Sequence, residues 1–173
     1  HSLTLIPPVR ESVVEGVRSA AVDGLITIGL EPGTETVAMI RQRHLPFVTI
    51  DGRVGGGFPV VGIDDRSSAA QAMRHVLELG HVDIGVVCFV DEPQLGTNSQ
   101  VKANRLLGYR DALGAAGREE GVRYWECESS ISGGREATER ILEESSRPTA
   151  IVAMSDVIAL GVLEFLTERG LAV

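Results

Sequence analysis

A chain of 173 residues with 43% hydrophobic residues is long enough to build a packed core, as one domain or as two smaller lobes. Its formal net charge of −8 argues against binding of nucleic-acid phosphates by this segment, because such binding depends on clustered lysine and arginine. No apolar stretch approaches the roughly 18 residues of a membrane-spanning helix, and no signal segment opens the chain. We therefore expect a cytoplasmic protein that does not bind membranes.

Short apolar strands alternate with amphipathic helices along the chain. Strands are predicted at residues 2–6, 23–29, 46–51, 60–63, 82–89, 122–127 and 149–154. Helices are predicted near residues 10–21, 33–43, 65–79, 99–116, 132–145 and 156–169. Gly80, Gly117 and Gly170 each follow a predicted helix, where glycine commonly ends helices. This order predicts an α/β fold with mostly parallel strands and helices on both faces of the sheet.

The alternation breaks between residues 51 and 64. Three consecutive glycines at 55–57 and then Pro59 interrupt any helix, which favours a flexible surface turn. A phosphate-binding loop is disfavoured, because no GxGxxG or GxxxxGK[ST] pattern opens a helix here. A strand without a preceding crossover helix indicates a move to a different sheet. We therefore predict an amino-terminal lobe at 1–63 and a carboxy-terminal lobe at 64–173.

The sequence offers little for catalysis or metal binding. His75 and His81 flank a predicted helix end, but zinc needs three or four convergent ligands, so structural roles are favoured. Cys88 and Cys127 lie in predicted core strands without CxxC spacing, which favours buried thiols over a disulfide or a metal site. There is no GxSxG nucleophile elbow and no cofactor loop. We expect no enzymatic activity, no cofactor and no metal.

Polar residues gather where predicted strands end. They are Asp51, Arg105 in the helix after strand 82–89, Glu128, and the pair Ser155 and Asp156. Taken singly, each has a simpler explanation as a turn former, a helix-face charge, a solvated strand end or a helix cap. Ligands of open α/β sheets bind at the carboxyl ends of strands, however, and the polar loop at 91–100 follows one of these strands. Together these residues predict a cleft between the lobes for a hydroxyl-rich small molecule.

Several segments resemble, in order, the effector-binding core of the LacI/GalR family of transcriptional regulators. They are VDGLITIG, LPFVTID, VGIDDRSSAAQAMRHVLELGH, DIGVV, NRLLGYRDAL and PTAIVAMSDVIALGVLEFLTERG. The resemblance implies a type I periplasmic-binding-protein-like fold, in which two parallel-sheet lobes close on a small sugar or sugar-like effector. It also implies a dimeric, allosteric repressor that binds operator DNA through an N-terminal helix-turn-helix headpiece. That headpiece is absent here, so we expect this chain alone not to bind operator DNA.

The resemblance also assigns roles to the polar residues. It implies that Asp51, Arg105 and Ser155 contact the effector, that Glu128 occupies a position over the ligand, and that Asp156 mainly holds the turn. An exported sugar-binding protein of a transport system stays open as the alternative, because it shares the fold without acting on DNA. A helix-turn-helix before His1 would favour the regulator, and a signal peptide would favour the transport protein.

Overall fold

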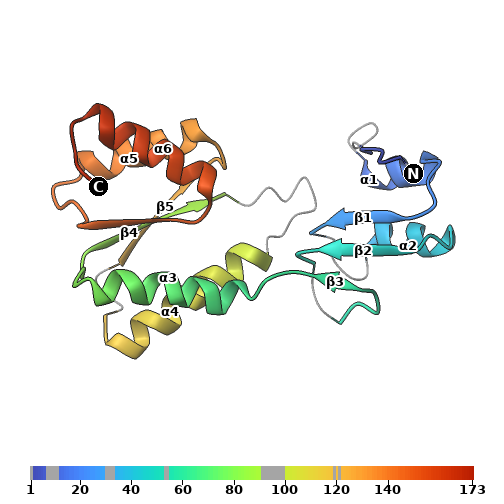
Figure 1. The fold of residues 1–173 in the computed structure, drawn as a ribbon, viewed down its shortest axis with the longest axis horizontal. Coiled ribbons are helices and arrows are strands. Elements are labelled where there is room, and N and C mark those ends of the chain that lie inside the picture. The colour runs from blue at the N-terminus through green and yellow to red at the C-terminus, as the bar shows by residue number, and fades with distance from the viewer. Residues whose placement is uncertain are drawn as a thin grey trace. The chain divides into compact units, whose positions relative to one another are not determined.

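The computed structural model describes residues 2–6, 12–29, 34–52, 55–90, 100–118, 120 and 122–173. Within this part of the chain the residues form two compact units, which divide between Ile63 and Asp64, except that Gln100 is grouped with the first unit. Each unit contains one three-stranded parallel sheet (Figure 1). The α/β fold class with two parallel sheets is thereby confirmed. The assignment of the two units as lobes of one ligand-binding core stays a prediction.

The first unit packs two helices against a sheet of order β1-β2-β3. Its elements are α1 (Val13–Ser19), β1 (Leu25–Ile28), α2 (Glu35–Gln42), β2 (Phe47–Ile50) and β3 (Val60–Val61). Ser12 and Thr34 begin the two helices, since their hydroxyl oxygens accept hydrogen bonds from the backbone N–H groups of Glu15 and Val37. The core of this unit is small and is formed by Val17, Val37, Ile40 and the inward-facing Thr49.

Two predictions for the first unit are wrong. Residues 2–6 form no strand, and Leu3 and Leu5 are exposed, because no described strand pairs with this segment. The strand predicted at 60–63 is shorter and does not leave the sheet, since Val60 and Val61 pair in parallel with β2. The change of sheet therefore follows β3. The turn predicted at 55–57 is present: Gly55 and Gly57 have φ of 100° and 71°, and Arg41 Nη2 donates to the carbonyl oxygen of Gly56 at 2.8 Å.

The second unit is a fuller α/β sandwich with the strand order β5-β4-β6. Its elements are α3 (Asp65–Glu78), β4 (Ile84–Phe89), α4 (Gln100–Ala116), β5 (Val122–Cys127), α5 (Ile131–Glu143), β6 (Ala150–Ala153) and α6 (Asp156–Glu168). Helices α3 and α4 cover one face of the sheet, and α5 and α6 cover the other (Figure 1). The central strand β4 alternates between the two hydrophobic clusters, with Val86 and Cys88 in one and Val87 in the other.

Several local predictions for the second unit are confirmed. Gly80, Gly117 and Gly170 follow α3, α4 and α6 with φ of 90°, 62° and 68°, a backbone region that glycine enters without strain. Cys88 and Cys127 are free and buried, and burial raises the pKa of the Cys88 thiol to about 11. Most of the predicted binding loop at 91–100 lies outside the described residues. No described helix has both the length and the apolarity to span a bilayer.

Candidate functional site

Arg105 is fixed at the carboxyl end of the second unit's sheet by two neighbouring elements. Its Nε donates to Asp65 Oδ1 at 2.7 Å, and its Nη1 donates to the carbonyl oxygen of Met154, the residue directly after β6. The Asp65 side chain is 6% exposed and the Arg105 side chain 26% exposed. The guanidinium therefore joins α3, α4 and the end of β6, with part of its surface open to solvent.

A glycine on α4 allows this contact. A Cβ atom built at Gly108 would overlap the carbonyl oxygen of Arg66 and would lie 2.9 Å from the backbone nitrogen of Ala70. Only glycine therefore permits the close crossing of α3 and α4. Because Arg105 lies three residues before Gly108, about one helical turn, the crossing brings its guanidinium to the first turn of α3. The glycine of the RLLGY segment is therefore required by the close packing of α4 on α3.

A second ion pair fixes the beginning of α4. Lys102 Nζ lies 2.6 Å from Glu126 Oε1 on the edge strand β5. The Lys102 side chain is 9% exposed, whereas that of Glu126 is 60% exposed. A buried ammonium needs such a partner, because an isolated charge is costly to remove from water. The two cations in the first turns of α4 are thus each paired with a carboxylate of another element.

Ser155, and not Asp156, caps α6. Ser155 has the extended backbone typical of an N-cap, with φ −145° and ψ 158°, and its Oγ accepts from the backbone N–H of Ile158 at 3.5 Å. Asp156 is exposed and is the first residue of the helix, so the interpretation in which Asp156 holds the turn is wrong. The Ser155 hydroxyl accepts the capping bond and keeps its own hydrogen to donate.

Glu128 directly follows β5 and combines a fixed backbone with an exposed side chain. Its carbonyl oxygen accepts from the backbone N–H of Ser130 at 2.8 Å. A Cβ atom at Gly133 would overlap this same carbonyl oxygen, so the first turn of α5 packs directly on the backbone of Glu128. Within the described residues, Glu128 makes no ion pair.

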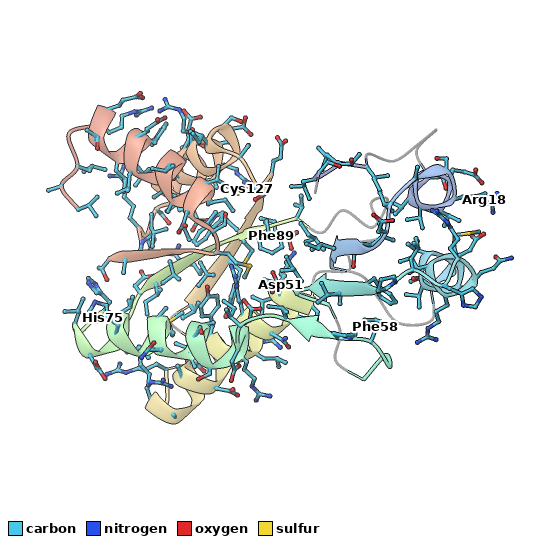
Figure 2. All side chains as sticks on the ribbon, turned by 45° about the vertical axis from the view of Figure 1, so that its right-hand side comes forward. Arg18, Asp51, Phe58, His75, Phe89 and Cys127 are labelled. Carbon is cyan, nitrogen blue, oxygen red and sulfur yellow. The ribbon has the colours of Figure 1, made fainter. Side chains whose placement is uncertain are left out.

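Asp51 follows β2 in the first unit (Figure 2). It has a φ of 53°, a left-handed conformation that aspartate tolerates better than most residues, and its N–H donates to the carbonyl oxygen of Val61 at 2.9 Å. The conformation is that of a residue ending a strand at a tight turn. The carboxylate is half-buried.

The structure brings part of the predicted set together. Arg105 and Ser155 lie together at the carboxyl ends of the strands of the second sheet, which we call this edge of the sheet, because Arg105 binds the carbonyl of the residue before Ser155. Glu128 and Asp156 lie at the same edge, after β5 and β6, without a described contact to Arg105. Asp51 belongs to the first unit. The described residues contain no group of three or more histidine, cysteine or acidic side chains arranged to hold a metal.

Residues 9–173 match the family model for periplasmic binding proteins and the sugar binding domain of the LacI family. The chain belongs to the LacI family. It is 33% identical over 158 residues to the HTH-type transcriptional repressor PurR of Pectobacterium carotovorum subsp. carotovorum, covering 88% of this chain and 44% of that protein. It is 31% identical over 178 residues to an HTH-type transcriptional regulator of Mycolicibacterium smegmatis, covering 91% and 48%.

Solved structures agree with this membership. A LacI-family transcriptional regulator from Corynebacterium glutamicum has a TM-score of 0.79 at 27% identity, covering 93% of this chain and 52% of that one. A LacI-family regulator from Enterococcus faecalis with bound ribose has a TM-score of 0.74 at 26% identity, covering 93% and 56%. The LacI-family chain spans about half the length of the curated relatives, at 44% and 48% of theirs. These relatives are named as transcriptional regulators and not as enzymes.

Sequence reasoning missed Asp65 and Lys102 in this LacI-family chain. The Asp65–Arg105 contact spans 40 residues and the Lys102–Glu126 contact spans 24, so no local spacing links the partners. The available signal was the Asp64–Asp65 pair opening a helix. Asp64 is the N-cap, and its side chain accepts a hydrogen bond from the Ser67 N–H. Asp65 is not needed for capping, and because it is buried its carboxylate requires a cationic partner.

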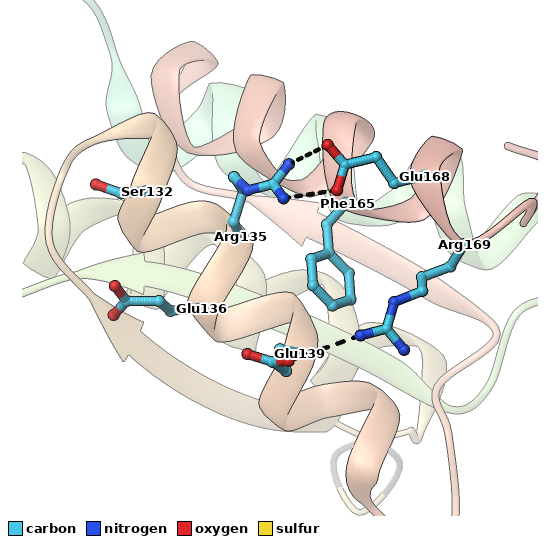
Figure 3. A pocket seen from close by; sticks show the side chains of 7 residues that line it. All are labelled: Ser132, Arg135, Glu136, Glu139, Phe165, Glu168 and Arg169. Carbon is cyan, nitrogen blue, oxygen red and sulfur yellow. Dashed lines mark hydrogen bonds and ion pairs between the residues drawn. The ribbon is translucent and has the colours of Figure 1, made fainter.

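A hollow of about 380 Å³ on the outer side of α5 and α6 is a weaker candidate (Figure 3). Four of its five charged side chains pair with one another: Arg135 binds Glu168 through two hydrogen bonds of 3.0 and 2.6 Å, and Arg169 lies 3.7 Å from Glu139. Both guanidinium groups also contact the ring of Phe165, at 5.7 and 4.8 Å from its centroid. These contacts hold the two helices together and leave little for a ligand.

Proposed function

We propose that this chain is the effector-binding core of a LacI-family transcriptional regulator and that it binds a small sugar or sugar-like effector. In the longer protein, effector binding would change the affinity for operator DNA. The observation that carries the proposal is the Arg105 guanidinium, held at the carboxyl ends of the strands by Asp65 and the Met154 carbonyl, directly beside Ser155. The ribose bound to the Enterococcus faecalis relative supports the ligand class.

The chemistry of this edge suits hydroxyl groups. Two N–H groups of Arg105 are used by Asp65 and Met154, and the others remain to donate in parallel to adjacent ligand oxygens. The Ser155 hydroxyl and the exposed carboxylate of Glu128 supply a donor and an acceptor. We include Asp156 at this edge and Asp51 in the first unit as further ligand contacts, since carboxylates accept from sugar hydroxyls.

Regulation follows from linkage. An effector that binds one conformation of the protein more tightly shifts the equilibrium toward that conformation, with a coupling of about 1–3 kcal/mol in typical allosteric proteins. The relatives named as transcriptional regulators support action on DNA by the longer protein. We further propose that it is a cytoplasmic homodimer. An exported sugar-binding protein is the second candidate, because the matching family model also includes periplasmic binding proteins.

Thermal unfolding with a panel of sugars and nucleobases, ribose included, tests the proposal. A ligand that binds only the folded state stabilises it by about 2.7 kcal/mol at a hundredfold excess over its Kd, which raises the Tm. We expect at least one sugar to raise the Tm and to change operator binding by the longer protein. If sugars raise the Tm without any effect on DNA binding, the transport candidate is favoured. If no panel member raises the Tm, the sugar-binding proposal fails.

A further inference from the structure

We propose that Asp65 is a positioning and specificity-determining residue, which offsets the charge of Arg105 and thereby makes this edge select an uncharged, hydroxyl-rich effector over an anionic one. The inference rests on the proposed function, because it specifies the chemical class of effector that the same site accepts. It adds a residue that does not itself contact the ligand.

The geometry of the ion pair supports this role. Asp65 Oδ1 binds Arg105 at Nε, the inner edge of the guanidinium, while Nη1 binds the Met154 carbonyl. The guanidinium is thus held in one orientation by two acceptors from different elements. Because the carboxylate lies 2.7 Å from the guanidinium and is almost fully buried, water screens the pair poorly, and a ligand meets oriented N–H donors with little net positive charge.

The other charged side chains at this edge also disfavour an anionic ligand. Lys102, the second cation in the first turns of α4, is paired with Glu126 at 2.6 Å. Glu128 and Asp156 are exposed at the ends of β5 and β6, and neither makes an ion pair within the described residues. The two cations of α4 are therefore each matched by a carboxylate, and the carboxylates of Asp64, Glu128 and Asp156 remain. One further cation lies nearby, since Arg140 Nη2 donates to the carbonyl oxygen of Glu126 at 2.7 Å. A phosphate or carboxylate on a ligand would meet an excess of negative charge.

Helix N-termini oppose this effect, since they favour anions, and α3, α4, α5 and α6 all begin at this edge. An N-cap is described for α3, α5 and α6. Each already has an internal acceptor. Asp64, Ser130 and Ser155 cap the three helices and bind a first-turn N–H in each case. Asp65 and Asp156 add carboxylates to the first turns of α3 and α6, where they offset the positive end of the helix dipole.

The competing explanation is that the Asp65–Arg105 pair only joins α3 to α4. That role predicts lower stability for Asp65→Asn and no change in the class of ligand bound. The specificity role predicts that the same variant gains anion binding, because Arg105 keeps its donors and loses its compensating charge. Stability alone does not separate the two explanations, whereas anion binding does.

Titration of inorganic phosphate into the intact protein, followed by calorimetry, is the direct test. We expect no saturable binding by the wild-type protein. We expect Asp65→Asn to bind phosphate at least tenfold more tightly than the limit measured for the wild type, a difference of about 1.4 kcal/mol in binding free energy. The double variant Asp65→Asn with Arg105→Met should lose this binding. Asp111→Asn is the matched control: it makes the same change of charge in another α3–α4 pair, the exposed Arg66–Asp111 pair, and should gain no phosphate binding.

Two results would overturn the inference: phosphate binding by a folded Asp65→Asn no tighter than by the wild type, or an equal gain in Asp111→Asn. Should Asp65→Asn not fold, the wild-type titration still decides, together with a comparison of Tm shifts for ribose and ribose 5-phosphate. A larger shift with the phosphate ester contradicts the inference. The phosphate titrations do not depend on sugar binding. Failure of the sugar panel would therefore contradict the proposed function without deciding the role of Asp65.

Discussion

The two sheets of the molecule are built from similar strands but are buried very differently. In the second unit, Ile84, Val86 and Val87 of the central strand are fully buried, at 0% exposure. In the first unit, Ile26 and Ile28 of β1 are 65% and 76% exposed. Both sets of strands read as short apolar runs in the sequence. Burial therefore depends on whether helices cover both faces of a sheet, which the composition of the strand does not report.

The first sheet also places its residues in an unexpected order. Thr49 of β2 points toward the helices and is fully buried, whereas Ile28, Ile50 and Val61 follow one another across the three strands on the open face. The more apolar residues thus lie on the side that no described helix covers. Substitutions on this open face and substitutions in the second unit should consequently have very different effects on stability.

The largest effect is expected where two helices of the second unit touch. A Cβ atom at Gly161 would overlap the carbonyl oxygen of Ile131 and would lie 2.9 Å from the backbone nitrogen of Arg135. Gly161→Val should therefore separate α5 from α6 and cost more than about 3 kcal/mol of unfolding free energy in urea titrations. Gly114→Ala, on the exposed side of α4, is the control and should stabilise by up to about 1 kcal/mol. Equal effects would contradict the close packing.

A matched pair of isoleucines tests the two sheets directly. Ile84→Ala removes buried methyl groups from the second unit and should cost about 2–5 kcal/mol. Ile28→Ala removes the same groups from the open face of the first unit and should change stability by no more than about 0.5 kcal/mol. Chemical denaturation of both variants of this chain is the measurement. A large loss for Ile28→Ala would show that the open face is covered in solution.

Substitutions of Arg105 and Asp51 test the proposed ligand contacts. Arg105→Lys keeps the charge but loses the forked donor geometry, so effector affinity should fall about tenfold to hundredfold, or about 1.5–3 kcal/mol. Asp51→Asn, in the first unit, keeps the shape but removes a strong acceptor and should weaken binding as well. Calorimetry with the effector identified from the sugar panel is the measurement. Unchanged affinity in both variants would remove Asp51 and Arg105 from the site.

The smallest effect concerns alkaline pH and belongs to the second unit, which contains both cysteines and both tyrosines of the sequence. Burial raises the pKa of Cys88 from 9.0 to about 11 and that of Tyr109 from 10.0 to about 12. The folded state then holds protons that the unfolded state releases, so stability should fall as the pH rises above about 9. Urea titrations at pH about 8 and about 10 measure this slope, and Cys88→Ala should flatten it.

Local features of the fold could be predicted from the sequence, and long-range ones could not. Strand β5 and the helix-ending glycines follow from residue type and spacing, because they depend on neighbours in the chain. The strand predicted at residues 2–6 failed because a strand also needs a partner. The sequence pointed to candidate residues directly after strands and, for Arg105, in the helix that follows a strand. It did not point to the buried partner Asp65, since its contact with Arg105 depends on the crossing at Gly108.

The arrangement at Glu128 has an evolutionary consequence. The first turn of α5 packs on the backbone of this residue through Gly133, while its side chain extends into solvent. Any side chain at this position can therefore change without disturbing the packing beneath it, in contrast to Arg105, which two neighbouring elements hold in place. Under the proposed function, a lineage could acquire a new effector preference here by a single codon change, while the packing beneath this position remains intact.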